Sequence, residues 1–439
     1  MDLQDLFSDL ATEQVEDAAL EGLDEEVALF DLDEAHPSSP SPSSEGDSKL
    51  GEKQQEDPKE IVLSPEGIAF FRSNTFTLYK EDTLLWPVQD SLDPFLSLID
   101  GSIVNEYIKN GYFMREVSSI SVLAKYLFHI MCCTADKSLR RSACDSLIYL
   151  LTTCNSMPYI KQELCLVLVN LGGDMSNLWE DVLHYKSRVI PPPSCASPED
   201  EASQMTDSQL REVLVVLLRF LSQWLIRYKN YTAKDVDDLL LIFLIIGLDP
   251  KVIDNALDAD IGACITHTLK LYSSDKEFFQ RMRNIVKWLL EYCSGDLPSV
   301  VYLCQAYLSP TGRGRKMRGV LAFHQLCQHL RLSKESFVAD VQARDIADLL
   351  TSYFQISPDL TVAYDSYYII KLVDLSLHLD LVQQDQKDDL KTICDLAEQK
   401  FHRSQGSADD MNPTISFQCL VATLSRWSSC YTRLASLDE

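Results

Sequence analysis

The chain has 439 residues, of which 46% are hydrophobic, and a formal net charge of −27. Its apolar content is sufficient for a large folded body, and its length allows one large domain or two to three ordinary ones. The acidic excess excludes a body that wraps bare DNA by bulk electrostatics, because such binding depends on clustered Lys and Arg.

The first sixty residues form a separate acidic region. Residues 1–60 carry a net charge of −16, against −11 for the remaining 379 residues. The stretch 35–60 is rich in Ser, Pro and Glu and has almost nothing to bury. Because so little apolar mass cannot offset the entropy of ordering, we predict that this tail is disordered in isolation.

Short apolar groups within the tail suggest peptide contacts. Leu3, Leu6, Phe7 and Leu10 fall at helical spacing among acids. This spacing is typical of a docking peptide that folds into a partner's groove, although an acidic solubilising tail explains the composition equally simply. The runs 27–34 and 59–66 offer a further contact, as strands added to a small modifier such as SUMO.

Helical periodicity dominates from about residue 65 onward, so the predicted fold class is all-α. No repeat of fixed length is present, and the helices are apolar enough to need neighbours on both sides. We therefore predict an irregular α-solenoid of HEAT-like helical pairs. It comprises an N-terminal helical block (61–185), a Pro-stiffened polar loop (186–205) and a C-terminal block of the same solenoid (206–439). Periodic segments cover roughly 119–133, 138–152, 160–171, 316–331, 336–355, 361–381, 386–403 and 414–433.

Three further helices have clear start signals. Thr206 with Gln209, Thr232 with Asp235, and Ser274 with Glu277 each have the spacing of a capping box. The apolar runs 213–226 and 239–248 follow two of these starts. We interpret the runs as surplus apolar surface that a partner covers, so residues 60–439 alone are expected to aggregate. The longer fully apolar run spans about half a bilayer, which predicts no membrane segment.

Cysteine usage and motif searches point away from catalysis. The thirteen cysteines include no C-x-x-C pair, which predicts reduced thiols in the cytosol or nucleus. His324, Cys327 and His329 do not share one helical face, so helix packing is favoured over a zinc site. His129, beside Cys132 and Cys133, has no nearby acid in the sequence to complete a nucleophile dyad. We predict neither an enzyme nor a bound cofactor.

The stretch "SPTGRGRKMRG" (309–319) combines three glycines and four cations. It fails as a phosphate-binding loop, because Gly314 is not followed by Lys-Ser/Thr. We predict a turn in which Pro310 closes one helix, Gly312 and Gly314 allow a tight reversal, and the next helix begins near Lys316. Three roles remain open for the cations: pairing with the chain's own acids, contacting an acidic partner, or contacting phosphate, including weak DNA binding. The cations are Arg313, Arg315, Lys316 and Arg318.

Three stretches resemble a known family. "VLAKYLFHIMCCTADKSLRRSACDSLIYLL" (122–151), "LVLVNLGGDMSNLWE" (166–180) and "VYLCQAYLSPTGRGRKMRGVLAFHQLC" (301–327) are similar to segments of the SMC five/six complex localisation factor family, the Nse-six type with the CANIN domain. The resemblance spans about 65–405, and this chain departs from the pattern in having Gly312 before the first Arg. The resemblance implies an α-solenoid subunit that forms a heterodimer with an Nse-five-type helical subunit and brings the SMC five/six complex to damaged or viral DNA.

Two functional readings follow. The first is a nuclear, non-enzymatic adaptor of genome maintenance. The alternative is a transcription or signalling regulator, in which the acidic Leu/Phe tail is an activation segment and the helical body binds peptides. Mass spectrometry of the purified complexes separates them, because the first predicts SMC subunits and the second predicts coactivators.

Overall fold

The protein is described by a computed structural model. It describes residues 66–71, 120–134, 136–154, 160–176, 178, 206–253, 257–308, 311–332, 337–356, 363–377, 379, 382–401 and 413–436. The chain divides into two compact units, Met1–Lys59 and Glu60–Glu439, and every described residue belongs to the second. Of the part described, 79% is helical and none forms a strand, which confirms the all-α prediction.

The helices follow one another with short connections. They are α4 (Ile120–Cys133), α5 (Lys137–Thr153), α6 (Lys161–Asn170), α8 (Asp207–Arg227), α9 (Ala233–Leu248), α10 (Asp258–Lys270), α11 (Asp275–Cys293), α12 (Leu297–Ala306), α13 (Gly312–His329), α14 (Ala343–Ile356), α15 (Ala363–Ser376), the 3-10 turn η5 (Gln384–Gln386), α16 (Lys387–Phe401) and α17 (Pro413–Ala435).

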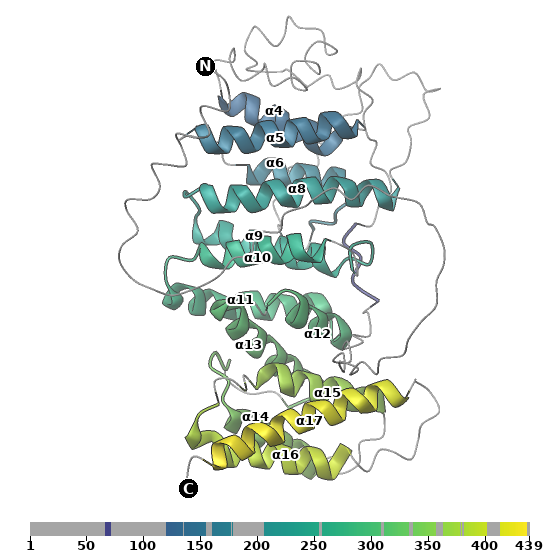
Figure 1. Ribbon diagram of the computed structural model, residues 1–439, viewed down its shortest axis with the longest axis vertical. Helices are drawn as coiled ribbons and strands as arrows, with labels where there is room; N and C mark the ends of the chain where they lie inside the picture. Colours follow the sequence, from purple (N-terminus) through teal and green to yellow (C-terminus); the bar gives the residue numbers. More distant parts are fainter. Residues whose placement is uncertain are drawn as a thin grey trace, which may run out of the picture. The chain divides into compact units, whose positions relative to one another are not determined.

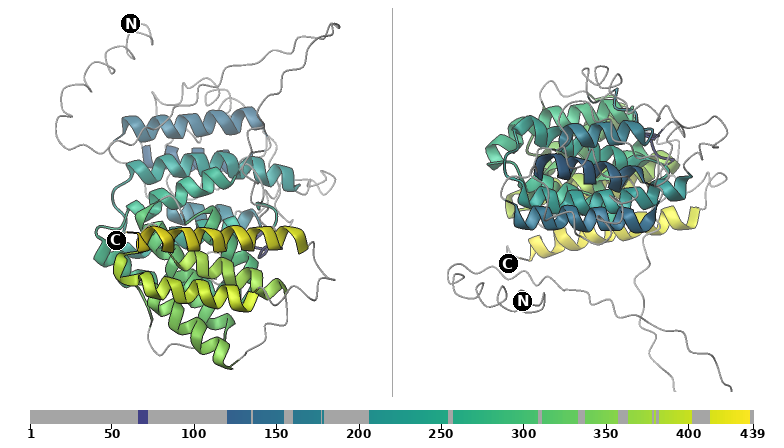
Figure 2. Two further views of the ribbon diagram at one scale, coloured as in Figure 1. Left: turned by 60° about the horizontal axis from the view of Figure 1, so that its bottom comes forward. Right: turned by 90° about the horizontal axis from the view of Figure 1, so that it is seen from above.

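Within this unit, helices pack on neighbours that are close in the chain. α4 contacts α5, α5 contacts α8, α8 contacts α10, and α10 contacts α9. The order continues through α11, α12 and α13 to α15, and then through α14, α16 and α17. Figure 1 shows these helices stacked one behind the next, and Figure 2 shows the same packing from two further directions. Each helix therefore buries one face against the preceding helices and another against the following ones.

The predicted helix starts are confirmed at all three sites. Thr206 and Thr232 form complete capping boxes with Gln209 and Asp235, which satisfy backbone N–H groups at both helix starts. The Ser274 side chain caps α11 by accepting from the Glu277 N–H. The Glu277 carboxylate instead accepts from Ser273.

Two helix predictions need correction. Helix α10 was not predicted, because its sequence, DADIGACITHTLK, has a glycine and few apolar residues. The helix predicted from residue 336 begins instead at Ala343, and residues 337–342 are irregular. Tertiary contacts explain this difference, since the Phe337 ring stacks on His324, with centroids 4.4 Å apart, and Val338 hydrogen-bonds to the same imidazole.

The apolar runs are largely buried within the chain. In α9, every residue from Leu239 to Leu248 is buried, and in α8 only Val215 and Ile226 are exposed apolar side chains. The interpretation of these runs as surplus surface for a partner was therefore wrong. Neighbouring helices of the same chain cover them, so the runs give no reason to expect residues 60–439 to aggregate.

A short segment before the first described helix is fastened to the body. Phe70 and Phe71 are each 1% exposed. Their backbone N–H groups donate to Oδ2 of Asp249, the C-cap residue of α9, over 2.7 and 2.8 Å. The Phe70 carbonyl accepts from Asp174, just after α6, and a Cβ at Gly173 would lie 2.7 Å from the Phe70 ring. This segment thus joins the ends of two helices that are far apart in sequence.

Several predictions concern residues outside those described. These are the disorder of the tail, the docking peptide of Leu3, Leu6, Phe7 and Leu10, the strand run 27–34 and the loop 186–205. Of the run 59–66, only Glu66 is described. The division into N-terminal and C-terminal helical blocks also remains a prediction. Among the described helices, none combines the length and apolar character that a membrane span requires.

Candidate functional site

The basic segment 311–319 forms the first two turns of helix α13. The helix begins at Gly312, and the Thr311 side chain caps it by accepting from the Gly314 N–H at 2.9 Å. The prediction that this helix begins near Lys316 after a glycine-rich reversal was therefore wrong. Gly314 is required for close approach, since a Cβ there would lie 2.7 Å from the Leu308 carbonyl oxygen. Pro310 lies outside the described residues.

Arg313 connects the ends of three helices. Its Nη1 donates to the carbonyls of Leu269 and Tyr272, at the C-terminal end of α10, over 2.8 and 3.0 Å. Its Nε donates to Asp275, the first residue of α11, at 2.8 Å. A cation near the start of α13 is disfavoured by that helix's dipole, but the same charge lies at the end of α10, where a dipole favours it. This cation is therefore bound within the chain.

Lys316 is the second cation held by its own body. Its ammonium group pairs with Asp340, which precedes α14, and lies over the Phe279 ring, 5.6 Å from the centroid. Burial lowers the pKa of Lys316. The Phe279 ring is nevertheless 38% exposed, so it remains accessible from solvent beside the lysine.

The other two cations differ from this pair. The Arg315 side chain is exposed and forms no ion pair with any residue that the structure describes. Arg318 is half-buried, and its backbone carbonyl accepts a weak bond from the thiol of Cys304. Of the four predicted contact residues, Arg315 is thus the cation best placed to meet another molecule.

Two clefts of about 490 Å³ each lie at this end of α13, and Gly312 and Lys316 line both. The first cleft also contains Arg315, Asp340 and Asp385, so its two cations are balanced by two carboxylates. A site for phosphate needs an excess of positive charge, which this cleft lacks. The geometry therefore favours pairing within the chain for Arg313 and Lys316 and a polar protein contact at Arg315.

The division of roles within the basic segment is testable by stability. Arg313→Ala is expected to lower the free energy of unfolding by about 2 kcal/mol, because it removes charge-assisted bonds to two half-buried carbonyls. Arg315→Ala, the matched control on the same helix, should change it by less than about 0.5 kcal/mol. Urea denaturation of the full chain measures both values. Equal effects would contradict the assignment.

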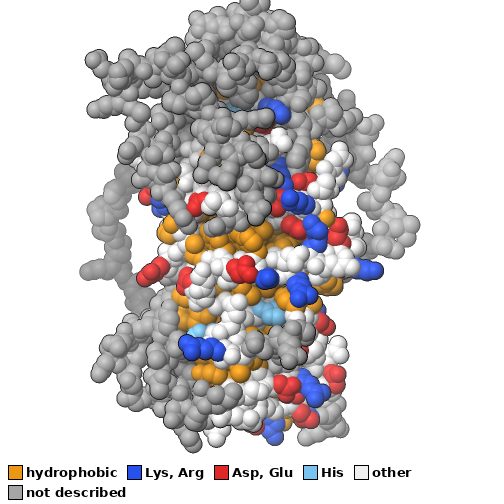
Figure 3. Space-filling view, turned by 180° about the vertical axis from the view of Figure 1, so that it is seen from behind, with side chains coloured by type: hydrophobic (Ala, Val, Ile, Leu, Met, Phe, Trp, Pro, Cys, Tyr) orange, Lys and Arg blue, Asp and Glu red, His pale blue; other side chains and the backbone are white. Residues whose placement is uncertain are grey.

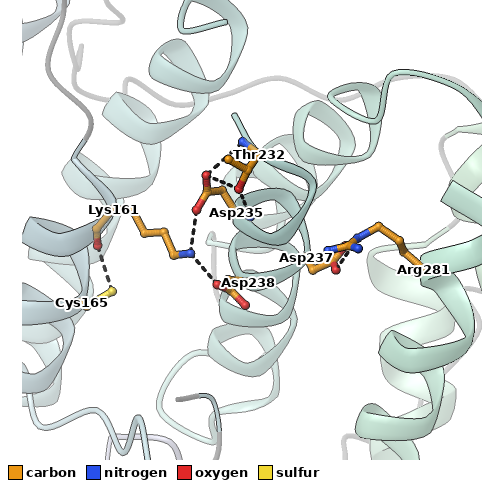
Figure 4. A network of polar contacts seen from close by, with 7 residues as sticks. All are labelled: Lys161, Cys165, Thr232, Asp235, Asp237, Asp238 and Arg281. Carbon is orange, nitrogen blue, oxygen red and sulfur yellow. Dashed lines mark hydrogen bonds and ion pairs between the residues drawn. The ribbon is translucent and has the colours of Figure 1, made fainter. Parts of the chain in front are cut away.

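A second polar cluster links α6, α9 and α11. The Lys161 ammonium bonds to Asp235 at 2.9 Å and to Asp238 at 2.5 Å, with all three side chains 11–15% exposed (Figure 4). On the other side of α9, Asp237 pairs with Arg281 of α11 at 2.7 Å. Burial lowers the pKa of Lys161, but its bonds to the two aspartates raise it further, so the net shift is upward. Each partner's charge is satisfied internally, which identifies a structural cluster.

The structure also supplies the acid that the sequence does not place beside His129. Nε2 of this buried histidine lies 2.8 Å from Oε2 of Glu163 on α6, and Lys125 pairs with the other carboxylate oxygen at 3.1 Å. The expectation of no acid beside His129 was thus wrong. Burial raises the pKa of the Cys133 thiol to about 12 and that of Cys132 well above its ordinary value. Because the thiolate is the nucleophile, these cysteines are suited to packing rather than catalysis.

Acid is expected to weaken the Glu163 cluster. Burial raises the Glu163 pKa, but bonds from His129 and Lys125 outweigh it, so the net shift is downward. A lowered folded-state pKa stabilises the fold above the unfolded value, roughly pH 4.3, and this contribution is lost as pH falls through the folded value. The difference in unfolding free energy between wild type and Glu163→Gln should therefore shrink below about pH 4.3. Urea denaturation at pH 3 to 7 measures it, and a constant difference would contradict the coupling.

The described residues contain no group of three or more His, Cys, Asp or Glu placed to hold a metal ion. His324, one of the three residues weighed as zinc ligands, lies between the Phe337 ring and the Val338 backbone.

Comparison with known proteins adds no assignment. No protein-family model matches the chain, and no curated protein matches it.

Proposed function

We propose that this chain is a non-enzymatic scaffold subunit of genome maintenance. It is built as an irregular α-solenoid of HEAT-like helical pairs, forms a heterodimer with an Nse-five-type helical subunit in the nucleus, and recruits or regulates the SMC five/six complex. The identity of the partners rests on the resemblance of residues 122–151, 166–180 and 301–327 to the localisation factor family.

The observation that best supports a scaffold is the serial packing of the helices. Each helix contacts neighbours close in sequence, from α4 and α5 through α8 and α10 to α16 and α17. Assemblies of this kind present extended surfaces for other proteins. Figure 3 shows one such face, on which apolar side chains lie between charged ones.

The chemistry of the described side chains supports a binding role over catalysis. Tyr302 and Tyr307 both donate to the Asp258 carboxylate, and burial, the largest cause, raises the pKa of Tyr307. Like the Lys161 cluster, this group is satisfied by its own neighbours and lies among packed helices. Arg315 and the exposed Phe279 ring, in contrast, offer polar and apolar contacts to a partner.

Affinity purification of the tagged full chain from nuclear extract, with mass spectrometry, tests this proposal. We expect the SMC five/six subunits and a helical subunit at equal stoichiometry. Recovery of transcriptional coactivators without SMC subunits would overturn the proposal and favour the regulator with an acidic activation segment. A cytoplasmic distribution of the tagged chain would contradict the nuclear assignment.

A further inference from the structure

A groove runs between α5 and α8, which lie side by side in Figure 1. Lys137 of α5 bonds to Glu212 of α8 at 2.6 Å, and further along both helices the thiol of Cys144 lies 3.9 Å from the Val216 carbonyl. The two helices therefore run in the same direction, with their outward faces in register. The groove has a volume of about 450 Å³.

The groove is basic, although the chain is strongly acidic. Its lining includes the cations Lys137, Arg140, Arg141 and Arg219 against the carboxylates Asp145 and Glu212. Glu212 already pairs with Lys137 and, at 3.6 Å, with the buried Arg140. That leaves Arg141 and Arg219, both exposed and neither in an ion pair with a described residue. The open side of the groove thus presents two uncommitted positive charges.

Apolar side chains accompany these charges at helical spacing. On α8, Val215, Arg219 and Ile226 share one face, and Val215 and Ile226 are 41% and 44% exposed. On α5, Arg141 and Tyr149 share one face, and Tyr149 is 55% exposed. Three of the five large apolar side chains exposed in the described part of the chain therefore lie on these two helices. Such a concentration marks a binding surface.

From this arrangement we infer that the α5/α8 groove binds an acidic amphipathic helix of a partner protein. The partner's Leu or Phe side chains pack on Val215, Ile226 and Tyr149, and its carboxylates pair with Arg141 and Arg219. Charge complementarity favours this occupant, because an apolar peptide without acids would leave both arginines without partners and a nucleic acid would face Asp145 and Glu212. The surface is separate from the basic start of α13 and does not depend on the SMC five/six assignment.

The test uses the full chain and a fluorescent peptide of residues 1–20 as the probe, because this peptide has the required acids and Leu/Phe spacing. We expect saturable binding by fluorescence anisotropy that weakens as salt increases. Arg141→Glu with Arg219→Glu should raise the dissociation constant at least tenfold. Arg344→Glu with Lys391→Glu, the same charge change at exposed positions on α14 and α16, should leave it within twofold.

Two further measurements address the apolar half of the site. Val215→Ser keeps every groove charge and should also weaken binding, whereas a probe with its acids replaced by amides should not bind. Circular dichroism and thermal unfolding confirm that each variant is folded. Absence of probe binding, or equal loss in the groove and control variants, would overturn the inference. If substituting Leu3, Leu6, Phe7 and Leu10 by Ser in the full chain raises probe affinity tenfold, the chain's own tail is the occupant and a partner helix is excluded.

Discussion

Replacing Asp249 by alanine is expected to lower the free energy of unfolding by about 4 kcal/mol. The side chain is fully buried and accepts from the backbone N–H groups of Phe70, Phe71 and Lys251. Hydrogen bonds to a charged group stabilise more than neutral ones, and their removal leaves buried donors without a partner. The segment 66–71 should then detach from the ends of α6 and α9.

Chemical denaturation measures the stability change, and hydrogen exchange at Phe70 and Phe71 reports the detachment. Asp395→Ala is the matched control, since this aspartate is exposed on α16, and it should change stability by less than about 0.5 kcal/mol. An Asp249→Ala protein with wild-type stability and slow exchange at both phenylalanines would refute the role given to this carboxylate.

Lys161→Met is expected to lower the free energy of unfolding by about 3–4 kcal/mol, because it leaves two largely buried carboxylates without their shared cation. Asp235 retains its bonds to Thr232, whereas Asp238 loses its only printed ion pair in the cluster shown in Figure 4. A single substitution therefore exposes the energetic cost of an uncompensated buried charge.

The second variant in this series removes the unpaired charge. Replacing Asp238 by leucine in the Lys161→Met background should restore most of the stability, since an apolar pair can replace a buried ion pair at little cost. Lys287→Met, at an ammonium 75% exposed in an i,i+4 pair, is the control and should be nearly neutral. Urea denaturation decides the outcome. A double variant no more stable than Lys161→Met would show that packing, rather than charge, explains the loss.

The helix starts at Thr206, Thr232 and Ser274 were predictable because the interactions that make them are local. Each cap joins residues three positions apart, so the sequence contains both partners within one turn. The all-α class followed from periodicity for the same reason. Helix α10 escaped prediction because its formation depends on packing against α8 and α9 rather than on a strong pattern of its own.

The candidate site shows the limit of local reasoning. The cations of 313–318 were found by composition, but their division into Arg313 and Lys316, held by the body, and the exposed Arg315 depends on Asp275 and Asp340, which lie 38 and 24 positions away. The groove cations Arg141 and Arg219 were not recognised, because their proximity requires α5 and α8 to pack side by side.

The sequence by itself thus determined the helical class, three helix starts and the presence of a basic segment in an acidic chain. Only the tertiary structure decided that α9 is covered from within, that Glu163 lies beside His129, and that Asp249 fastens Phe70, which lies 179 positions away. The physical reason is one of range. Capping and amphipathic periodicity act within a few residues, whereas burial and the pairing of charges depend on which helices come together, and no local pattern encodes that.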